Sequence, residues 1–236
     1  MDARLSDSFV SAVLRELRQL LGFAGLTRWR IYSTTVNVFV IVAFGIVVPW
    51  RRGIEFFDPL LLLLYSVIAL LFSAPGITEL LGREWRDART VLARVFASAL
   101  FGWGAFCLIL LLGVASVQLQ YRAGRILFPA PNTVGAALSL SLTASLAVSA
   151  IGALFSVVLD PLSAKLILRA GFVGFLLLLL FGGRFLPPAW QASLAQNITP
   201  RAVTQSAYIV SGILAVLAAG PVIALSFTRS RDASGA

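Results

Sequence analysis

Apolar residues gather in six stretches along the chain, and short polar segments rich in arginine separate them. A helix needs about 20 apolar residues to cross the ~30 Å hydrocarbon core of a bilayer, and each stretch has about this length. The pattern therefore predicts six transmembrane helices, at residues 32–50, 57–74, 91–117, 134–159, 162–182 and 203–227. Only Asp160 and Pro161 separate the fourth stretch from the fifth, so a hairpin or re-entrant pair is the alternative to two full spans there.

The residues before the first span have a helical periodicity. Apolar side chains recur there every three or four positions, as in an amphipathic helix; they are Val10, Val13, Leu14, Leu17, Leu20, Leu21 and Ala24. Arg28, Trp29 and Arg30 follow, and these residue types are typical of the boundary between lipid and water. We therefore expect residues 1–31 to form an interfacial amphipathic helix. The alternative is an ordinary cytoplasmic helix packed on a partner.

Composition places the chain among all-α polytopic membrane proteins and removes most enzyme classes. Hydrophobic residues make up 59% of the 236 residues, charged residues make up 12%, and the mean hydropathy is +0.93, whereas soluble domains carry about twice that share of charge. The chain has no histidine and one cysteine, Cys107, which excludes an internal disulfide and the commonest metal ligand. It also lacks the GxSxG and GxxxxGK[ST] motifs. We expect no catalytic residue, metal or cofactor in this chain.

The distribution of arginine predicts the orientation. Thirteen of the 19 basic residues fall on one side of the six-span arrangement, and basic loops are retained in the cytoplasm. Both termini, including a short tail at residues 228–236, are therefore predicted to be cytoplasmic, on either side of a transmembrane domain at residues 32–227. The net charge of +9 lies in short runs between apolar stretches, so we do not expect nucleic acid as a partner.

Acidic residues are absent from the middle of every predicted span. Carriers coupled to protons or sodium need ionisable groups buried along their pathway, so this class of transporter is disfavoured. If the chain transports a substrate, another chain must supply the energy.

The segment between the second and third spans combines an apolar stripe with charges of both signs. Its sequence, PGITELLGREWRDARTVLAR, covers residues 75–94 and fits a short amphipathic helix. Mixed charge favours docking to a protein surface over adhesion to anionic lipid, which would favour arginine alone. The candidate contact residues are Glu79, Arg83, Glu84, Trp85, Arg86, Asp87 and Arg89. The alternative is a solvated loop whose arginines only fix the topology.

Small residues recur every three or four positions along the fourth predicted span. They are Ser141, Ser145, Ser149, Gly152 and Ser156. Such a stripe lets helix backbones approach closely and lets hydroxyls bond across an interface. We interpret it as helix packing within the subunit, with a hydroxyl-lined substrate path as the alternative.

These features together resemble the ABC-2 type permeases, the membrane halves of ATP-driven exporters, sometimes called type V. The resemblance covers nearly the whole chain: six spans with cytoplasmic ends, an amphipathic helix before the first span, and the Arg83-Glu84 pair after the second. The segment before the sixth span adds Leu186, Pro187, Trp190, Gln191, Asn197 and Pro200.

The resemblance implies a permease that pairs with a second permease chain, as a homodimer or heterodimer, in a bacterial inner (plasma) membrane. Separate cytoplasmic ABC ATPase chains would bind ATP and Mg and would drive the permease through the charged segment. The lack of buried charge favours an amphiphilic or apolar cargo over a small ion. A non-transporting membrane subunit that anchors or assembles a larger complex is the alternative function.

Overall fold

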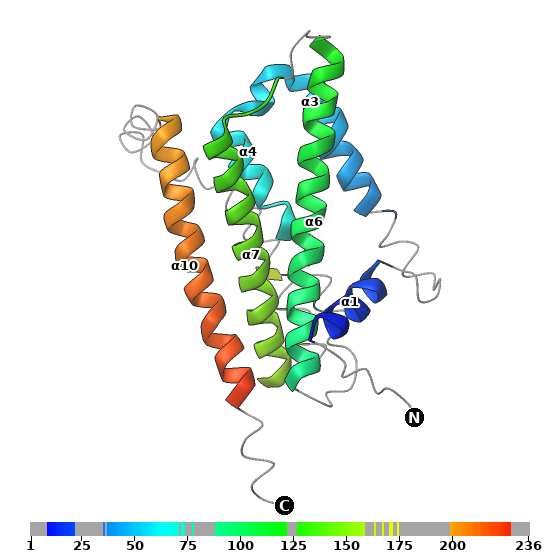
Figure 1. Ribbon diagram of the computed structural model, residues 1–236, viewed down its shortest axis with the longest axis vertical. Coiled ribbons are helices and arrows are strands. Elements are labelled where there is room, and N and C mark those ends of the chain that lie inside the picture. The colour runs from blue at the N-terminus through cyan, green and yellow to red at the C-terminus, as the bar shows by residue number, and fades with distance from the viewer. Residues whose placement is uncertain are drawn as a thin grey trace, which may run out of the picture.

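A computed structural model describes residues 9–21, 35, 37–70, 72–73, 77, 88–121, 127–158, 163, 167, 170–171, 174 and 199–227. Nearly all of these residues are helical, and none of them lies in a strand. Three long helices, α6 (Ala88–Tyr121), α7 (Pro131–Val158) and α10 (Pro200–Phe227), stand side by side (Figure 1). The predicted all-α fold class is confirmed.

Four helices within the described residues are long and apolar enough to cross a membrane. They cover Asn37–Phe57, Arg89–Tyr121, Pro131–Phe155 and Pro200–Ala224. Their positions match the predicted first, third, fourth and sixth spans, and they identify the chain as an integral membrane protein. The predicted fifth span, residues 162–182, lies almost wholly outside the described residues, as does the tail at residues 228–236.

Neighbouring helices of the bundle do not simply alternate in direction. The backbone of the first span approaches Leu112 of α6 at Gly45 and approaches Tyr121 at Gly53, so the first span runs parallel to α6. The next long helix, α7, runs antiparallel to α6, and α10 runs parallel to α7 (Figure 1). For two consecutive helices to run parallel, the chain that connects them has to return to the end of the bundle where the first of them began.

A proline gives the first span its irregular form. The helix contains a π-helical stretch η1 (Ala43–Val47), a short helix α3 (Val48–Arg52) and a 3-10 turn η2 (Gly53–Phe57). Pro49 has no N–H to donate to the carbonyl of Gly45, and its ring disfavours regular α-helix there. The hydroxyl of Ser116 on α6 donates to that carbonyl instead, at 3.3 Å. A side chain on a neighbouring helix thus satisfies the backbone group that the proline leaves without its usual donor.

The second predicted span, residues 57–74, is not one uninterrupted α-helix. Helix α4 (Pro59–Ser66) begins after Asp58, whose carboxylate accepts hydrogen bonds from the N–H groups of Leu60 and Leu61 at 2.9 and 3.3 Å. A turn follows at residues 67–68, where each N–H bonds to the carbonyl three residues earlier. The eight residues of α4 span only about 12 Å, so α4 is not among the four candidate crossing helices.

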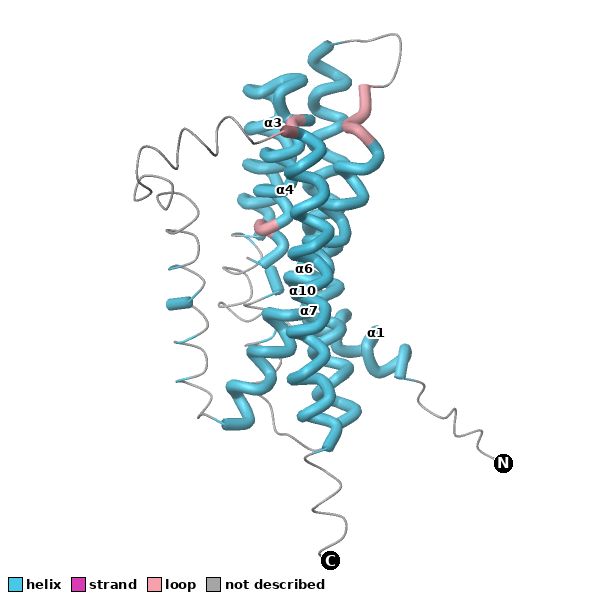
Figure 2. The backbone as a smooth tube through the Cα atoms, turned by 90° about the vertical axis from the view of Figure 1, so that its left-hand side faces the viewer, coloured by secondary structure: helices cyan, strands magenta, loops and turns pink. Residues whose placement is uncertain are grey.

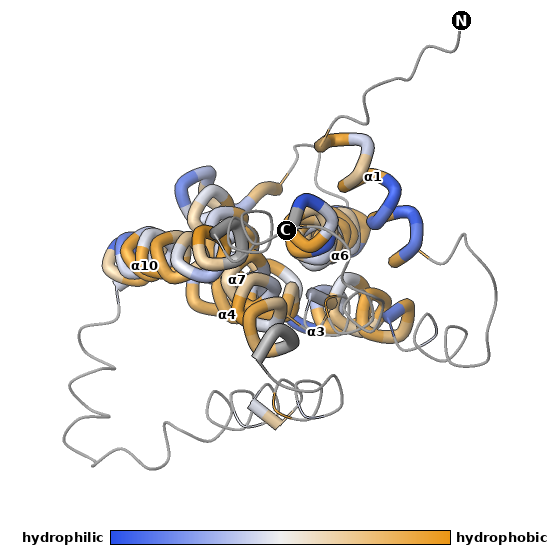
Figure 3. Tube along the Cα trace, turned by 90° about the horizontal axis from the view of Figure 1, so that it is seen from below, coloured by the Kyte–Doolittle hydropathy of each residue, from blue (hydrophilic) through white to orange (hydrophobic). Residues whose placement is uncertain are grey.

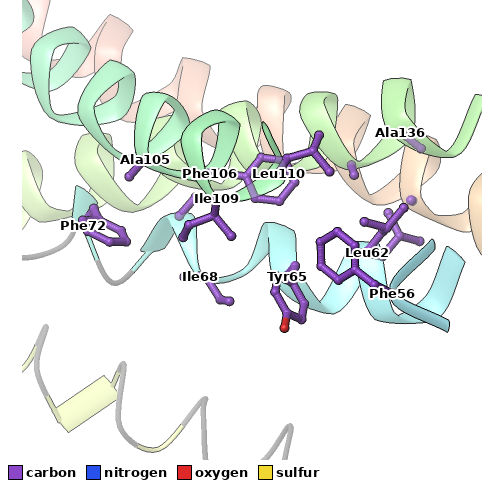
Figure 4. Packing of buried hydrophobic residues seen from close by; sticks show 14 of the residues in the cluster. Phe56, Leu62, Tyr65, Ile68, Phe72, Ala105, Phe106, Ile109, Leu110 and Ala136 are labelled. Carbon is purple, nitrogen blue, oxygen red and sulfur yellow. The ribbon is translucent and has the colours of Figure 1, made fainter. Parts of the chain in front are cut away.

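The largest apolar cluster joins the first span, α4, α6 and α7. Phe56 and Leu62 are fully buried on one side of it, and Phe106 and Ile109 of α6 are fully buried on the other (Figure 4). Gly113 of α6 makes room for the ring of Phe56, because a side chain at position 113 would overlap that ring.

This close contact predicts different effects of alanine at two glycines of α6. Gly113→Ala forces a methyl group into the Phe56 ring, and such overpacking typically costs 1 to 3 kcal/mol. No neighbouring atom lies within 4 Å of the position that a methyl group would take at Gly104, so Gly104→Ala serves as the matched control. Thermal unfolding in detergent should show a lower Tm for Gly113→Ala only. Equal Tm values for the two variants would contradict the packing described.

Candidate functional site

The predicted ATPase-contact segment is described at few positions. Arg89 is exposed in the first turn of α6. The other predicted contact residues, Glu79, Arg83, Glu84, Trp85, Arg86 and Asp87, lie outside the described part of the chain. Ile77, from the same segment, is fully buried and packs in a cluster with Val91 and Val95 of α6 and with alanines of α7. The segment is therefore anchored to the bundle at Ile77 and is continuous with α6 at its other end.

Helix α1 (Phe9–Leu20) lies across the lower end of α6 (Figures 1 and 2). The contact is formed by Ala12, Val13, Leu17 and Leu20 of α1 with Ala93, Phe96 and Ala97 of α6. Ala93 and Ala97 are fully buried and small, which lets the two helix backbones approach closely. Within the predicted segment of residues 1–31, the structure describes a helix at Phe9–Leu20, and this helix packs on a helix of its own chain.

A buried ion pair lies inside this contact. Glu16 Oε2 of α1 is 3.5 Å from Arg94 Nε of α6, and the side chains are only 5% and 8% exposed. Neither atom has a hydrogen-bond partner among the described residues, so the interaction is electrostatic rather than a well-aligned hydrogen bond. Each charge depends on the other, because a buried charge without a partner is strongly destabilising.

The sequence analysis does not single out this pair, because it considers acidic residues only in the middle of the spans and uses the basic residues only to predict the orientation. The sequence nevertheless contains an indication of a buried charge at both positions. Glu16 follows Ala12 and Val13 at helical spacing, on the apolar face of its helix, and Arg94 falls within the predicted apolar span 91–117. A charged residue in an apolar setting implies a partner.

The surface of α1 has three distinct sides. One side packs on α6 through Ala12, Val13 and Glu16. A second side is apolar yet uncovered, since Val10, Leu14 and Leu21 are 64%, 49% and 51% exposed. The third side is polar, and Arg15 and Arg18 are exposed on it. Figure 3 shows α1 at the edge of the bundle, beside α6, with hydrophilic and hydrophobic positions alternating along it. This arrangement favours the interfacial location, which stays a prediction.

The predicted stripe of small residues on α7 faces the interior. Ser141, Ser145, Ser149 and Gly152 are buried, and the side chain of Ser156 lies outside the described part. A methyl group at Gly102 of α6 would come within 2.9 Å of Ser145 Oγ and 2.6 Å of the Ala69 carbonyl oxygen. Helices α6 and α7 are therefore in very close contact at Ser145. This burial favours helix packing as the interpretation of the stripe.

Hydroxyl groups also connect α7 with α10. Ser211 Oγ lies 2.6 Å from Ser139 Oγ and 3.1 Å from Thr143 Oγ1, and the hydroxyl of Tyr208 donates to the carbonyl of Asn132 at 3.2 Å. The residues pair in increasing order along both helices, which confirms that α7 and α10 run parallel. The sequence analysis does not single out Ser211 or this contact.

The described residues contain no group of three or more side chains that could hold a metal ion. The thiol of Cys107 is partly buried on α6 and unpaired with another cysteine. Among the described residues, the contact of α1 with α6 is the one that contains a buried ion pair.

The ion pair predicts a pattern of stabilities in detergent. Glu16→Gln leaves the Arg94 charge buried alone and is expected to lower the free energy of unfolding by about 3 to 5 kcal/mol. Combining Glu16→Gln with Arg94→Met removes both charges and should recover much of this loss. Glu55→Gln is the control, because the Arg52–Glu55 pair is 60% and 76% exposed and such pairs contribute up to about 1 kcal/mol. A double variant less stable than Glu16→Gln would contradict the pairing.

No family model, curated protein or solved structure matches the chain. The function is therefore inferred from the geometry above together with the sequence.

Proposed function

We propose that the chain is the permease subunit of an ATP-driven exporter of the ABC-2 type. In this proposal it crosses a bacterial inner membrane six times with both termini in the cytoplasm. It pairs with a second permease chain, identical or related. Separate ATPase chains bind ATP and Mg, contact residues 75–94 and drive the export of an amphiphilic or apolar cargo.

The parallel helix pairs support six crossings. The first span runs parallel to α6, so the chain between Phe57 and Ala88 has to return to the end where α6 begins. Likewise, α7 and α10 are parallel, so the chain between Val158 and Pro200 has to return to the end where α10 begins. Adding these two returns to the four candidate helices gives an even number of crossings, which places both termini on one side.

The orientation in this proposal comes from the sequence. Trp50 and Tyr121 are about half exposed at the end opposite α1, and such aromatic side chains are typical of a membrane boundary. Among the described residues, three arginines are exposed at each end: Arg15, Arg18 and Arg89 at the α1 end, and Arg51, Arg52 and Arg201 at the other. The α1 end is assigned to the cytoplasm because 13 of the 19 basic residues of the whole sequence fall on that side of the six-span arrangement.

The observation that carries the proposed mechanism is the continuity of α6. This helix has 34 residues and is roughly 50 Å long. It begins at Ala88, within the charged segment of residues 75–94, contacts Glu16 of α1 through Arg94, and ends beside the turn of the first span at Gly53. Because α6 is one stiff helix, a displacement of its cytoplasmic end moves α1 directly. The same displacement is transmitted along α6 to the opposite face of the membrane.

In the proposed cycle, closure of the ATPase dimer pushes on residues 75–94. Helix α6 and the attached α1 then move together against α7 and the first span. Two discrete packings of these helices would expose the cargo path alternately to the two sides of the membrane. The chain itself transmits force and does no chemistry.

Cysteine labelling is expected to confirm the orientation. In a Cys107→Ser background, Asn132→Cys and Arg89→Cys place thiols at opposite ends of the bundle, and both positions are exposed. An impermeant maleimide applied to intact cells should label Asn132→Cys and reach Arg89→Cys only after permeabilisation. Labelling of Arg89→Cys from outside would invert the topology and remove the proposed ATPase contact.

ATP turnover tests the function. The purified chain should hydrolyse no ATP, whereas the complex co-purified from native membranes should show hydrolysis stimulated by cargo. One surface charge contributes little to a contact between proteins, so the test reverses two charges, Glu84→Arg with Arg86→Glu. This double variant should bind the ATPase more weakly while its Tm stays unchanged.

The matched control for that test is Arg52→Glu with Glu55→Arg, which reverses the exposed pair at the opposite end of the bundle. It should leave ATPase binding intact. Full ATPase binding by the Glu84/Arg86 variant would remove the segment from the mechanism. A complex whose ATP turnover never responds to cargo would favour a non-transporting anchor instead.

A further inference from the structure

An apolar cavity lies between α1, the first span and α6. Its volume is about 360 Å³, and its walls include Leu21, the residue after α1, Val38 of the first span, and Leu100 and Leu108 of α6. Asn37 supplies the one polar side chain among the described residues that line it. We call this space the α1 cavity.

The size and lining of the α1 cavity suit a hydrocarbon chain. An apolar cavity of about 150 Å³ in a soluble protein stays dry and binds benzene, and small-molecule sites begin at about 300 Å³. Between Leu100 and Leu108 the cavity follows α6 for roughly 12 Å. At Gly104, in the middle of this wall, no neighbouring atom comes within 4 Å of the position of a side-chain Cβ.

The α1 cavity opens toward the surface that faces lipid. Leu21, Val38 and Leu108 line it and are also 51%, 53% and 44% exposed. Because these side chains are apolar and lie on helices of a membrane protein, their exposed faces meet acyl chains rather than water. A lipid tail can therefore enter the cavity from the side, without crossing a polar barrier.

Positive charge lies beside the same opening. Arg18 is exposed on α1 and stands three residues before Leu21, so the two side chains are neighbours on the helix surface. The nearest acid on α1, Glu16, is buried against Arg94 and is thereby withdrawn from the surface. The exposed side of α1 is left basic, and a basic interfacial helix attracts anionic lipid headgroups.

We propose that the α1 cavity binds one acyl chain of an anionic phospholipid whose phosphate lies at Arg18. The bound lipid contacts α1 at Leu17 and Leu20, which also pack in the contact of α1 with α6, so the lipid tail extends that contact. This inference does not depend on the exporter function, because it concerns the chain alone in its membrane.

The test is native mass spectrometry of the purified, delipidated chain in detergent, titrated with dioleoyl phosphatidylglycerol or with the zwitterionic dioleoyl phosphatidylcholine. The wild type should retain one phosphatidylglycerol in preference to phosphatidylcholine. Gly104→Leu fills the cavity and should weaken the retention of both lipids at least tenfold. Gly212→Leu on α10 is the matched control, since its surroundings are equally open and it lies outside the cavity.

The headgroup contact has its own variant. Arg18→Gln should lower the preference for phosphatidylglycerol about fivefold, the contribution of one arginine near an anionic surface, and should leave phosphatidylcholine retention unchanged. Unchanged preference in this variant would overturn the assignment of the phosphate to Arg18.

Val38→Trp is a second variant that fills the cavity, for use if Gly104→Leu does not fold. Val38 is half exposed, so this position tolerates a larger side chain. Retention of phosphatidylglycerol by either folded variant at the wild-type level would overturn the cavity as the binding site. An equal loss of retention in Gly212→Leu would also overturn it, by showing that the effect is not local.

Discussion

Hydrocarbon offers no hydrogen bonds, and this constraint accounts for most of the architecture. Every backbone polar group in the bilayer core has to find a partner in the protein, so the described part of the chain is helical almost throughout. The departures from regular helix come with local replacements. Asp58 caps α4 where the chain turns back, and Ser116 donates to the Gly45 carbonyl that Pro49 leaves without its usual donor. Close packing then depends on glycines such as Gly102 and Gly113, which let bulky or hydrogen-bonded neighbours approach.

The same constraint gives the Glu16–Arg94 pair its importance. Two charges in a surface contact would contribute little, but these side chains are almost fully buried between α1 and α6. Separating them would leave each charge buried without its partner, so α1 and the N-terminal end of α6 behave as one unit. In the proposed exporter, this unit is the part that moves first, and the α1 cavity lies where its movement would change the space available to a lipid tail.

The long spans could be predicted from the sequence because length and hydropathy alone specify them. Four of the six predicted spans coincide with candidate crossing helices. The break after Ser66 could not be predicted, since residues 60–72 are apolar except for Tyr65 and Ser66, and a turn within such a stretch is not visible in hydropathy. The Glu16–Arg94 pair was missed for a different reason: it joins positions 78 residues apart, and their proximity is a property of the fold. The predicted contact residues before Arg89 lie outside the described part and stay a prediction.

The parallel packing of α7 and α10 also constrains how the protein is made. When the synthesis of α7 is complete, more than forty further residues have to be added before α10 begins. Ser139 and Thr143 are therefore made well before Ser211, the residue with which they bond. The hydroxyl contact between α7 and α10 can form only after most of the chain has been synthesised.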